Sequence, residues 1–144
     1  MIPGLLVFAI GLTVLPSPAA TGGEEAGQVA ERFARVLNDR RPADLQEILP
    51  RSGKILISIP DAGRTAGYYG NSQVEALFTG YLAGTTFRDC RIDHIEVQDG
   101  SYARIDLTAN RTGPDGEPAA VVYRLALQPE QGRWVLREIR ESTR

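Results

Sequence analysis

The sequence predicts an α+β domain whose elements follow the order helix, helix, strand, helix and then four antiparallel strands. Two observations predict this order. Apolar residues recur at the helical period in the first half of the chain, whereas from Phe87 onward they alternate with polar residues. Clusters of turn-forming residues divide this second half into segments of about 8–11 residues. A chain of 144 residues suits one such domain, and no linker is long enough to divide it.

The first twenty residues have the composition of an export signal rather than of the fold. The apolar run Leu5–Leu15 is shorter than the roughly 20 residues that a bilayer-spanning helix needs. Small side chains at Ser17 and Ala19 favour cleavage after Ala19, with Ala20 as the alternative. No Lys or Arg precedes the run, which departs from the usual pattern, and an uncleaved membrane anchor is the alternative. We therefore expect a signal peptide over residues 1–20 and a single periplasmic or secreted domain over residues 21–144.

The first helix is predicted over Glu24–Asn38. Four of its apolar residues form one stripe at the helical period: Val29, Phe33, Val36 and Leu37. Glutamates occupy its first turn and arginines lie at or beyond its end, which suits the helix dipole. We expect the stripe to pack against an apolar surface.

A second, shorter helix begins at Pro42, a residue that suits the first helical position, and Pro50 ends it. The β-branched segment Lys54–Ile59 then predicts a strand. A loop with three glycines follows, and it contains Tyr68 and Tyr69.

The third helix has the clearest end signals. Asn71 or Ser72 suits its N-cap, Ser72 and Glu75 match the S-x-x-E capping box, and Gly84 ends it. Its apolar residues again form one stripe, which indicates a core-facing helix.

The net charge of −2 and the pI near 5.4 argue against nucleic-acid binding as the main function. The arginines are scattered along the chain, which favours surface ion pairs over an anion site. One Cys and one His cannot form a zinc site or a disulfide framework, and no cofactor is indicated. Cys90 is interpreted as a small buried apolar side chain.

The order of elements resembles the nuclear transport factor 2-like superfamily, in which helices pack on a curved sheet to form a cone. The segment Tyr69–Phe78 resembles the entry to the third helix of this superfamily. The segments Phe87–Ile95 and Gly132–Leu136 resemble a group of small exported bacterial domains of uncharacterised function. The resemblance covers about residues 24–142, and it implies the fold. It implies no single activity, since the superfamily contains isomerases, dehydratases, hydrolases and binding modules.

The dipeptide Asp99-Gly100 predicts a two-residue hairpin. That turn would place Ile92 opposite Leu107, with His94 opposite Ile105 on the buried face. It would also place Asp93 opposite Asp106 on the outer face, where a solvated ion-pair cluster is favoured over an acid–base pair. Alternation shifts near His94, so a bulge is expected there.

His94 is the candidate catalytic residue, because it would point into the cone and histidine titrates near neutrality. The alternative is a structural histidine, hydrogen-bonded to a tyrosine or to the backbone. The candidate ligand-pocket residues are Tyr69, Tyr81, His94 and Tyr123. No Asp or Glu is placed inside the cone by the pattern.

Two functions are compatible with these observations. The first is a non-catalytic module that binds a small apolar ligand, or that binds a protein partner or a second copy through the outer sheet face. The second is a small-molecule enzyme of the ketosteroid isomerase or dehydratase type with a pocket around His94. We favour the first, because no acid–base pair is placed in the pocket. Contact with a membrane is expected only through an uncleaved N-terminal segment.

Overall fold

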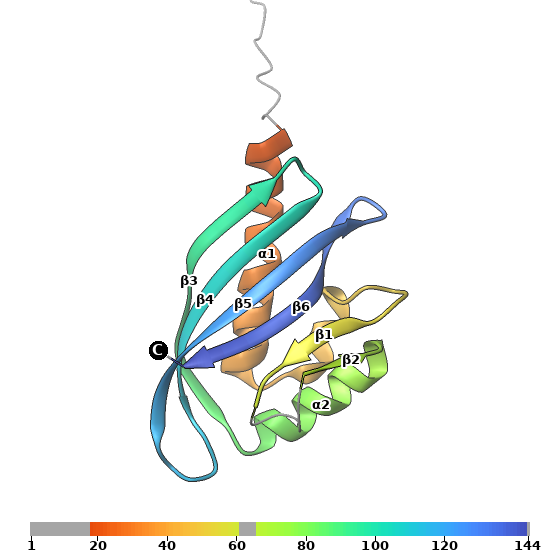
Figure 1. Cartoon of the computed structure of the whole chain (residues 1–144). Helices are drawn as coiled ribbons and strands as arrows, with labels where there is room; N and C mark the ends of the chain where they lie inside the picture. The colour runs from red at the N-terminus through yellow and green to blue at the C-terminus, as the bar shows by residue number, and fades with distance from the viewer. Residues whose placement is uncertain (1–17, 61–65, 144) are drawn as a thin grey trace, which may run out of the picture.

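The computed structural model describes residues 18–60 and 66–143, and it has the α+β architecture predicted from the sequence. Helices lie against one face of a six-stranded sheet (Figure 1). The helical elements are α1 (Pro18–Asp39), η1 (Pro42–Glu47) and α2 (Asn71–Ala83). The strands are β1 (Ile55–Ser58), β2 (Gly67–Tyr69), β3 (Thr86–Gln98), β4 (Tyr102–Thr112), β5 (Pro118–Glu130) and β6 (Arg133–Thr143).

The strands follow the order β2-β1-β6-β5-β4-β3 across the sheet. The last four strands pair in sequence as an antiparallel meander, which confirms the prediction for this half of the chain. Strand β1 joins the meander through a parallel pairing with β6, in which Ile57 lies opposite Ile139. The loop between β4 and β5 extends beyond the end of β6, where it approaches α2 (Figure 1).

The helices differ from the prediction in three ways. Helix α1 begins at Pro18, six residues before Glu24, so the predicted cleavage positions fall in its first turn. The second helix is a 3-10 helix, the form that short helical segments often take. Helix α2 has Gly70 as its N-cap, and the Gly70 N–H donates to Gln73 Oε1 at 2.9 Å, so Ser72 and Glu75 do not form the capping box. Gly84 is the C-cap, as predicted.

Most of the predicted leader, residues 1–17, and part of the predicted loop, residues 61–65, lie outside the described residues. Within the described part of the chain, no helix combines the length and apolar character needed to cross a membrane. The segment around Tyr68 and Tyr69 forms the short edge strand β2 rather than a loop, because it pairs with β1.

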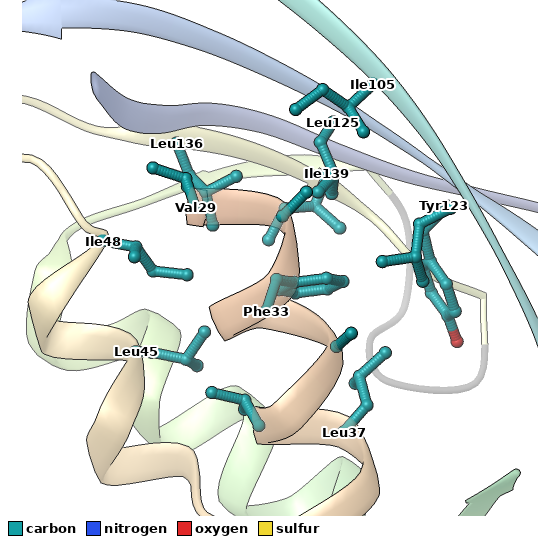
Figure 2. Close-up of a cluster of buried hydrophobic side chains, with 14 of the residues drawn as sticks. Val29, Phe33, Leu37, Leu45, Ile48, Ile105, Tyr123, Leu125, Leu136 and Ile139 are labelled. Carbon is teal, nitrogen blue, oxygen red and sulfur yellow. The ribbon is translucent and has the colours of Figure 1, made fainter. Parts of the chain in front are cut away.

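The core lies between α1 and the concave side of the sheet, and Phe33 is at its centre (Figure 2). The Phe33 ring is fully buried and makes edge-to-face contacts with Phe78 of α2 and Tyr123 of β5, at centroid distances of 6.0 and 5.9 Å. The apolar stripe predicted on the first helix therefore packs against both the sheet and α2. Aromatic rings fill this part of the cone, and the cavity described below lies outside it, between α2 and the loop that joins β4 to β5.

Arg40 holds the C-terminal end of α2 in place. The Arg40 guanidinium donates hydrogen bonds to the Leu82 carbonyl, at 2.7 Å from Nη2, and to the Ala83 carbonyl at 3.1 Å. These carbonyls belong to the last turn of the helix, where no backbone N–H of the helix is available to them. The residue that follows α1 thus fixes the end of α2, which forms one wall of the cavity described below.

Candidate functional site

An open cavity of about 690 Å³ lies between the C-terminal half of α2 and the loop that joins β4 to β5. We call it the α2 cavity. Its apolar lining comes mainly from α2 and the loop: Ala76, Leu77, Gly80, Gly84, Gly113, Pro114 and Ala119. Its polar lining residues are Tyr81, Thr85, Arg111, Asp115 and Glu117. The volume falls within the range of small-molecule sites, which is about 300–1,000 Å³.

Tyr81 connects the cavity to a buried group of polar side chains. Its hydroxyl donates to Glu141 Oε2 at 2.8 Å and lies 2.6 Å from the Tyr123 hydroxyl. The Tyr123 hydroxyl donates to the same Glu141 oxygen at 2.7 Å. Helix α2 and strands β5 and β6 thus meet at one carboxylate oxygen.

Arg111 completes this group, which we call the tyrosine–carboxylate cluster: Tyr81, Tyr123, Arg111 and Glu141. Arg111 Nη2 lies 3.1 Å from Glu141 Oε1, and the two side chains are only 11% and 2% exposed. The carboxylate therefore faces a guanidinium through one oxygen and two phenols through the other. A buried carboxylate needs such partners, because its desolvation is otherwise too costly.

Burial raises the pKa of both phenols above the ordinary value of tyrosine, and the negative charge of Glu141 adds to this effect. Both phenols are therefore protonated at neutral pH and act as donors. Since both Glu141 oxygens are engaged, the cluster forms a fixed polar base for the cavity.

Two of the predicted pocket residues, Tyr81 and Tyr123, belong to this cluster. Tyr69 lies on the edge strand β2, opposite Ile55, and is not part of the cavity lining. The placement of His94 on the buried face is wrong, because His94 is exposed and lies opposite Asp106 on the outer face. The structure therefore brings two of the four predicted residues together.

The hairpin between β3 and β4 explains the error at His94. Gln98 pairs with Tyr102, so the loop contains Ser101 as well as Asp99 and Gly100, and the predicted two-residue turn is wrong. The expected bulge is present at Asp93, between Ile92 and His94. Between the start of β3 and the bulge, Ile92 lies opposite Leu107 as predicted, whereas between the bulge and the turn Ile95, and not His94, lies opposite Ile105. A register shift of one residue moves a side chain to the other face of the sheet.

The prediction missed Glu141 and Arg111. Glu141 follows the buried Ile139 at a spacing of two residues, and Arg111 follows the buried Ala109 in the same way. Alternation along each strand therefore gave a signal that both charged side chains point toward the helices. It did not indicate that they form an ion pair with each other.

Cys90 is half-buried beside the bulged part of β3. Burial and the nearby charge of Asp89 raise the pKa of the Cys90 thiol from 9.0 to about 11.

Since the thiolate is the reactive form, we expect iodoacetamide at pH 8 to modify the Cys90 thiol of the folded protein about 100-fold more slowly than that of the urea-unfolded protein. Mass spectrometry of timed samples measures both rates. Equal rates would contradict the shielded environment of this thiol.

No model of a known protein family matches the chain, and no curated protein matches it in sequence. Solved structures do match it. A ketosteroid isomerase-like protein from Erwinia carotovora atroseptica has a TM-score of 0.70 at 15% identity, and the match covers 84% of this chain and 95% of that chain. For a candidate dehydratase of the nuclear transport factor 2-like family from Streptomyces avermitilis, the TM-score is 0.68 at 17% identity, with 86% and 96% covered.

An uncharacterised protein with a cystatin-like fold from Caulobacter vibrioides has a TM-score of 0.63 at 17% identity, and the match covers 86% of this chain and 90% of that chain. Together these structures show that the chain has the nuclear transport factor 2-like fold, as its resemblance implied. At such identities the likeness concerns the fold, and it assigns no activity.

Proposed function

We propose that this chain is a binding module that takes a small amphipathic molecule, neutral or positively charged, into the α2 cavity. The supporting observation is a cavity of about 690 Å³ whose lining combines apolar residues with polar side chains. Such a lining suits a ligand with an apolar body and one polar group, because the polar side chains fix its orientation.

The charges around the cavity favour a cationic group over an anionic one. Asp115 and Glu117 are exposed at the cavity and contribute two negative charges. The positive charge of Arg111 is offset by its ion pair with Glu141. An anionic ligand would therefore meet net repulsion, whereas an amine would be attracted.

The contacts of Glu141 favour binding over catalysis. A general base must offer an oxygen within hydrogen-bond reach of the substrate proton, whereas Glu141 accepts from two phenols and faces Arg111. The alternative function is an enzyme of the ketosteroid isomerase or dehydratase type, the descriptions given to two of the structural neighbours. His94 gives this alternative no support, because it lies on the outer face of the sheet.

Two probes with the same ring and opposite charge test the proposal: tyramine, a cation, and 4-hydroxyphenylacetate, an anion. We expect tyramine to bind more tightly in isothermal titration calorimetry, because of the two carboxylates at the cavity. Gly80→Leu should abolish this binding. A Cβ at Gly80 meets nothing within 4 Å, so the leucine side chain can occupy the cavity without a clash at the backbone.

Gly80→Leu should also keep the protein folded, because leucine favours helix over glycine by roughly 1 kcal/mol. Gly23→Leu is the matched control, since Gly23 lies in α1, away from the cavity, and its Cβ position is equally open. The control should bind tyramine like the unmodified protein. Equal tyramine binding by the Gly80→Leu variant, or no binding of either probe to the unmodified protein, would contradict the proposal.

A further inference from the structure

The outer face of the sheet contains a second hollow, of about 330 Å³, surrounded by arginines. We call it the arginine hollow. Its side chains come from three adjacent strands, β4, β5 and β6: Tyr102, Arg104, Arg124, Ala126, Glu138 and Arg140. These arginines are far apart in the sequence, which is why the pattern predicted scattered surface ion pairs.

The register of the sheet creates the hollow. Ala126 lies opposite Arg104 on β4 and opposite Glu138 on β6, so a short side chain is flanked by two long ones. Ala126 is only 7% exposed, although it is on the outer face, because its neighbours rise around it. It therefore forms the floor of the hollow, and the guanidinium groups form its rim.

The lining of the hollow contains more arginines than carboxylates. Arg124 and Arg140 lie directly opposite each other on β5 and β6, an arrangement that destabilises a sheet when the charges are alike. Arg124 reaches Asp106 only at 3.8 Å, beyond hydrogen-bond distance. Among the residues that the structure describes, no carboxylate lies within salt-bridge distance of Arg104.

Glu138 is the single acidic residue of the lining, and it pairs with Arg140. Within the lining, three guanidinium groups against one carboxylate leave a formal charge of +2 (3 − 1 = 2), while Glu96 and Asp106 lie beside the hollow, opposite Arg104 and Arg124. The Arg124 and Arg140 side chains are 56% and 53% exposed, so both are accessible. Ion pairs at such exposure contribute little to stability, so an incoming anion can compete with them.

We infer that the arginine hollow binds a dianionic phosphate group, either as free phosphate or as a phosphate monoester. Guanidinium groups form paired, charge-assisted hydrogen bonds with phosphate oxygens, and a dianion balances the formal charge of the lining residues. Tyr102 borders the hollow, so it gives an apolar surface for an organic group attached to the phosphate. Binding would also relieve the repulsion between Arg124 and Arg140.

Isothermal titration calorimetry with inorganic phosphate and with phenyl phosphate tests this inference. We expect both to bind, phenyl phosphate more tightly because its ring can pack against Tyr102. Arg104→Gln should weaken binding about tenfold, since a charge-assisted hydrogen bond is lost. Ala126→Leu should weaken it to a similar degree, because it fills the floor of the hollow and leaves every charge in place.

Arg88→Gln is the matched control. It removes one exposed arginine from the outer face, at the pairing with Asn110, and should leave phosphate binding unchanged. Sodium chloride at equal ionic strength controls for general screening. Vesicles of phosphatidylcholine with phosphatidic acid present the same phosphate group as a lipid headgroup.

Binding of the soluble phosphates, with or without the vesicles, supports the inference, and the vesicle result identifies the source of the phosphate. Three outcomes would overturn it. The first is equal affinity of the Arg104→Gln, Ala126→Leu and unmodified proteins. The second is an effect of phosphate that chloride reproduces, and the third is binding to the vesicles alone. Circular dichroism shows whether each variant is folded, and Arg104 is exposed enough for its replacement to be tolerated.

Discussion

Replacing Glu141 by leucine is expected to lower the free energy of unfolding by about 3–5 kcal/mol, because the Arg111 guanidinium is then left buried without its carboxylate. The variant also removes the acceptor of the Tyr81 and Tyr123 hydroxyls. Unfolding in urea, followed by circular dichroism, measures the loss. No other single polar side chain among the described residues accepts from two buried phenols.

Glu138→Leu is the matched control for this prediction. It is the same substitution on the same strand, three residues earlier, and it removes an exposed ion pair with Arg140 instead of a buried one. We expect a change of at most about 1 kcal/mol. The double variant Arg111→Met with Glu141→Leu should lose less than Glu141→Leu alone, because the buried guanidinium is removed together with the carboxylate. Equal losses for Glu138→Leu and Glu141→Leu would contradict the account of the cluster.

Replacing Phe33 by alanine is expected to lower the free energy of unfolding by about 3–5 kcal/mol, the usual cost of emptying a buried aromatic position. Phe33 is fully buried and lies between Phe78 and Tyr123, so its loss opens a void where α1, α2 and the sheet meet. The two rings that contact Phe33 come from different elements, α2 and β5, and each is held by its own backbone. Thermal and urea unfolding of the purified variant measure the effect.

Tyr68→Ala is the control for Phe33→Ala, since it removes another aromatic ring. Tyr68 is 69% exposed on the edge strand β2, so we expect a change within about 0.5 kcal/mol. A loss below about 1 kcal/mol for Phe33→Ala would mean that this ring does not hold α1 on the sheet.

The two sites on this fold differ in how their charges are used. In the tyrosine–carboxylate cluster, opposite charges are buried and paired, and the cluster forms a rigid base beside the α2 cavity. In the arginine hollow, like charges are exposed and adjacent, which suits a ligand that brings the missing negative charge. The two proposals thus concern different parts of the fold, an amphipathic molecule in the α2 cavity and a phosphate group in the arginine hollow.

Part of the candidate site could be predicted from the sequence. Tyr81 lies on the apolar stripe of a well-signalled helix, and Tyr123 lies in the inward phase of a strand, so both were expected in the pocket. Glu141 was not, because a charged residue near the chain terminus is usually interpreted as solvent-exposed. His94 was misplaced because a single bulged residue and a three-residue turn changed the phase of its strand.

By itself, the sequence determined the fold class, the order of the helices and of the four meander strands, and the faces that the first and third helices bury. These features depend on local spacing: the helical stripe around Phe33, the alternation after Phe87 and the turns between strands. Only the tertiary structure decided which distant side chains meet, such as Tyr81 with Glu141, or Arg104 with Arg124 and Arg140. The physical reason is that such contacts depend on strand register and on the seating of α2, and a shift of one residue reverses the face on which a side chain lies.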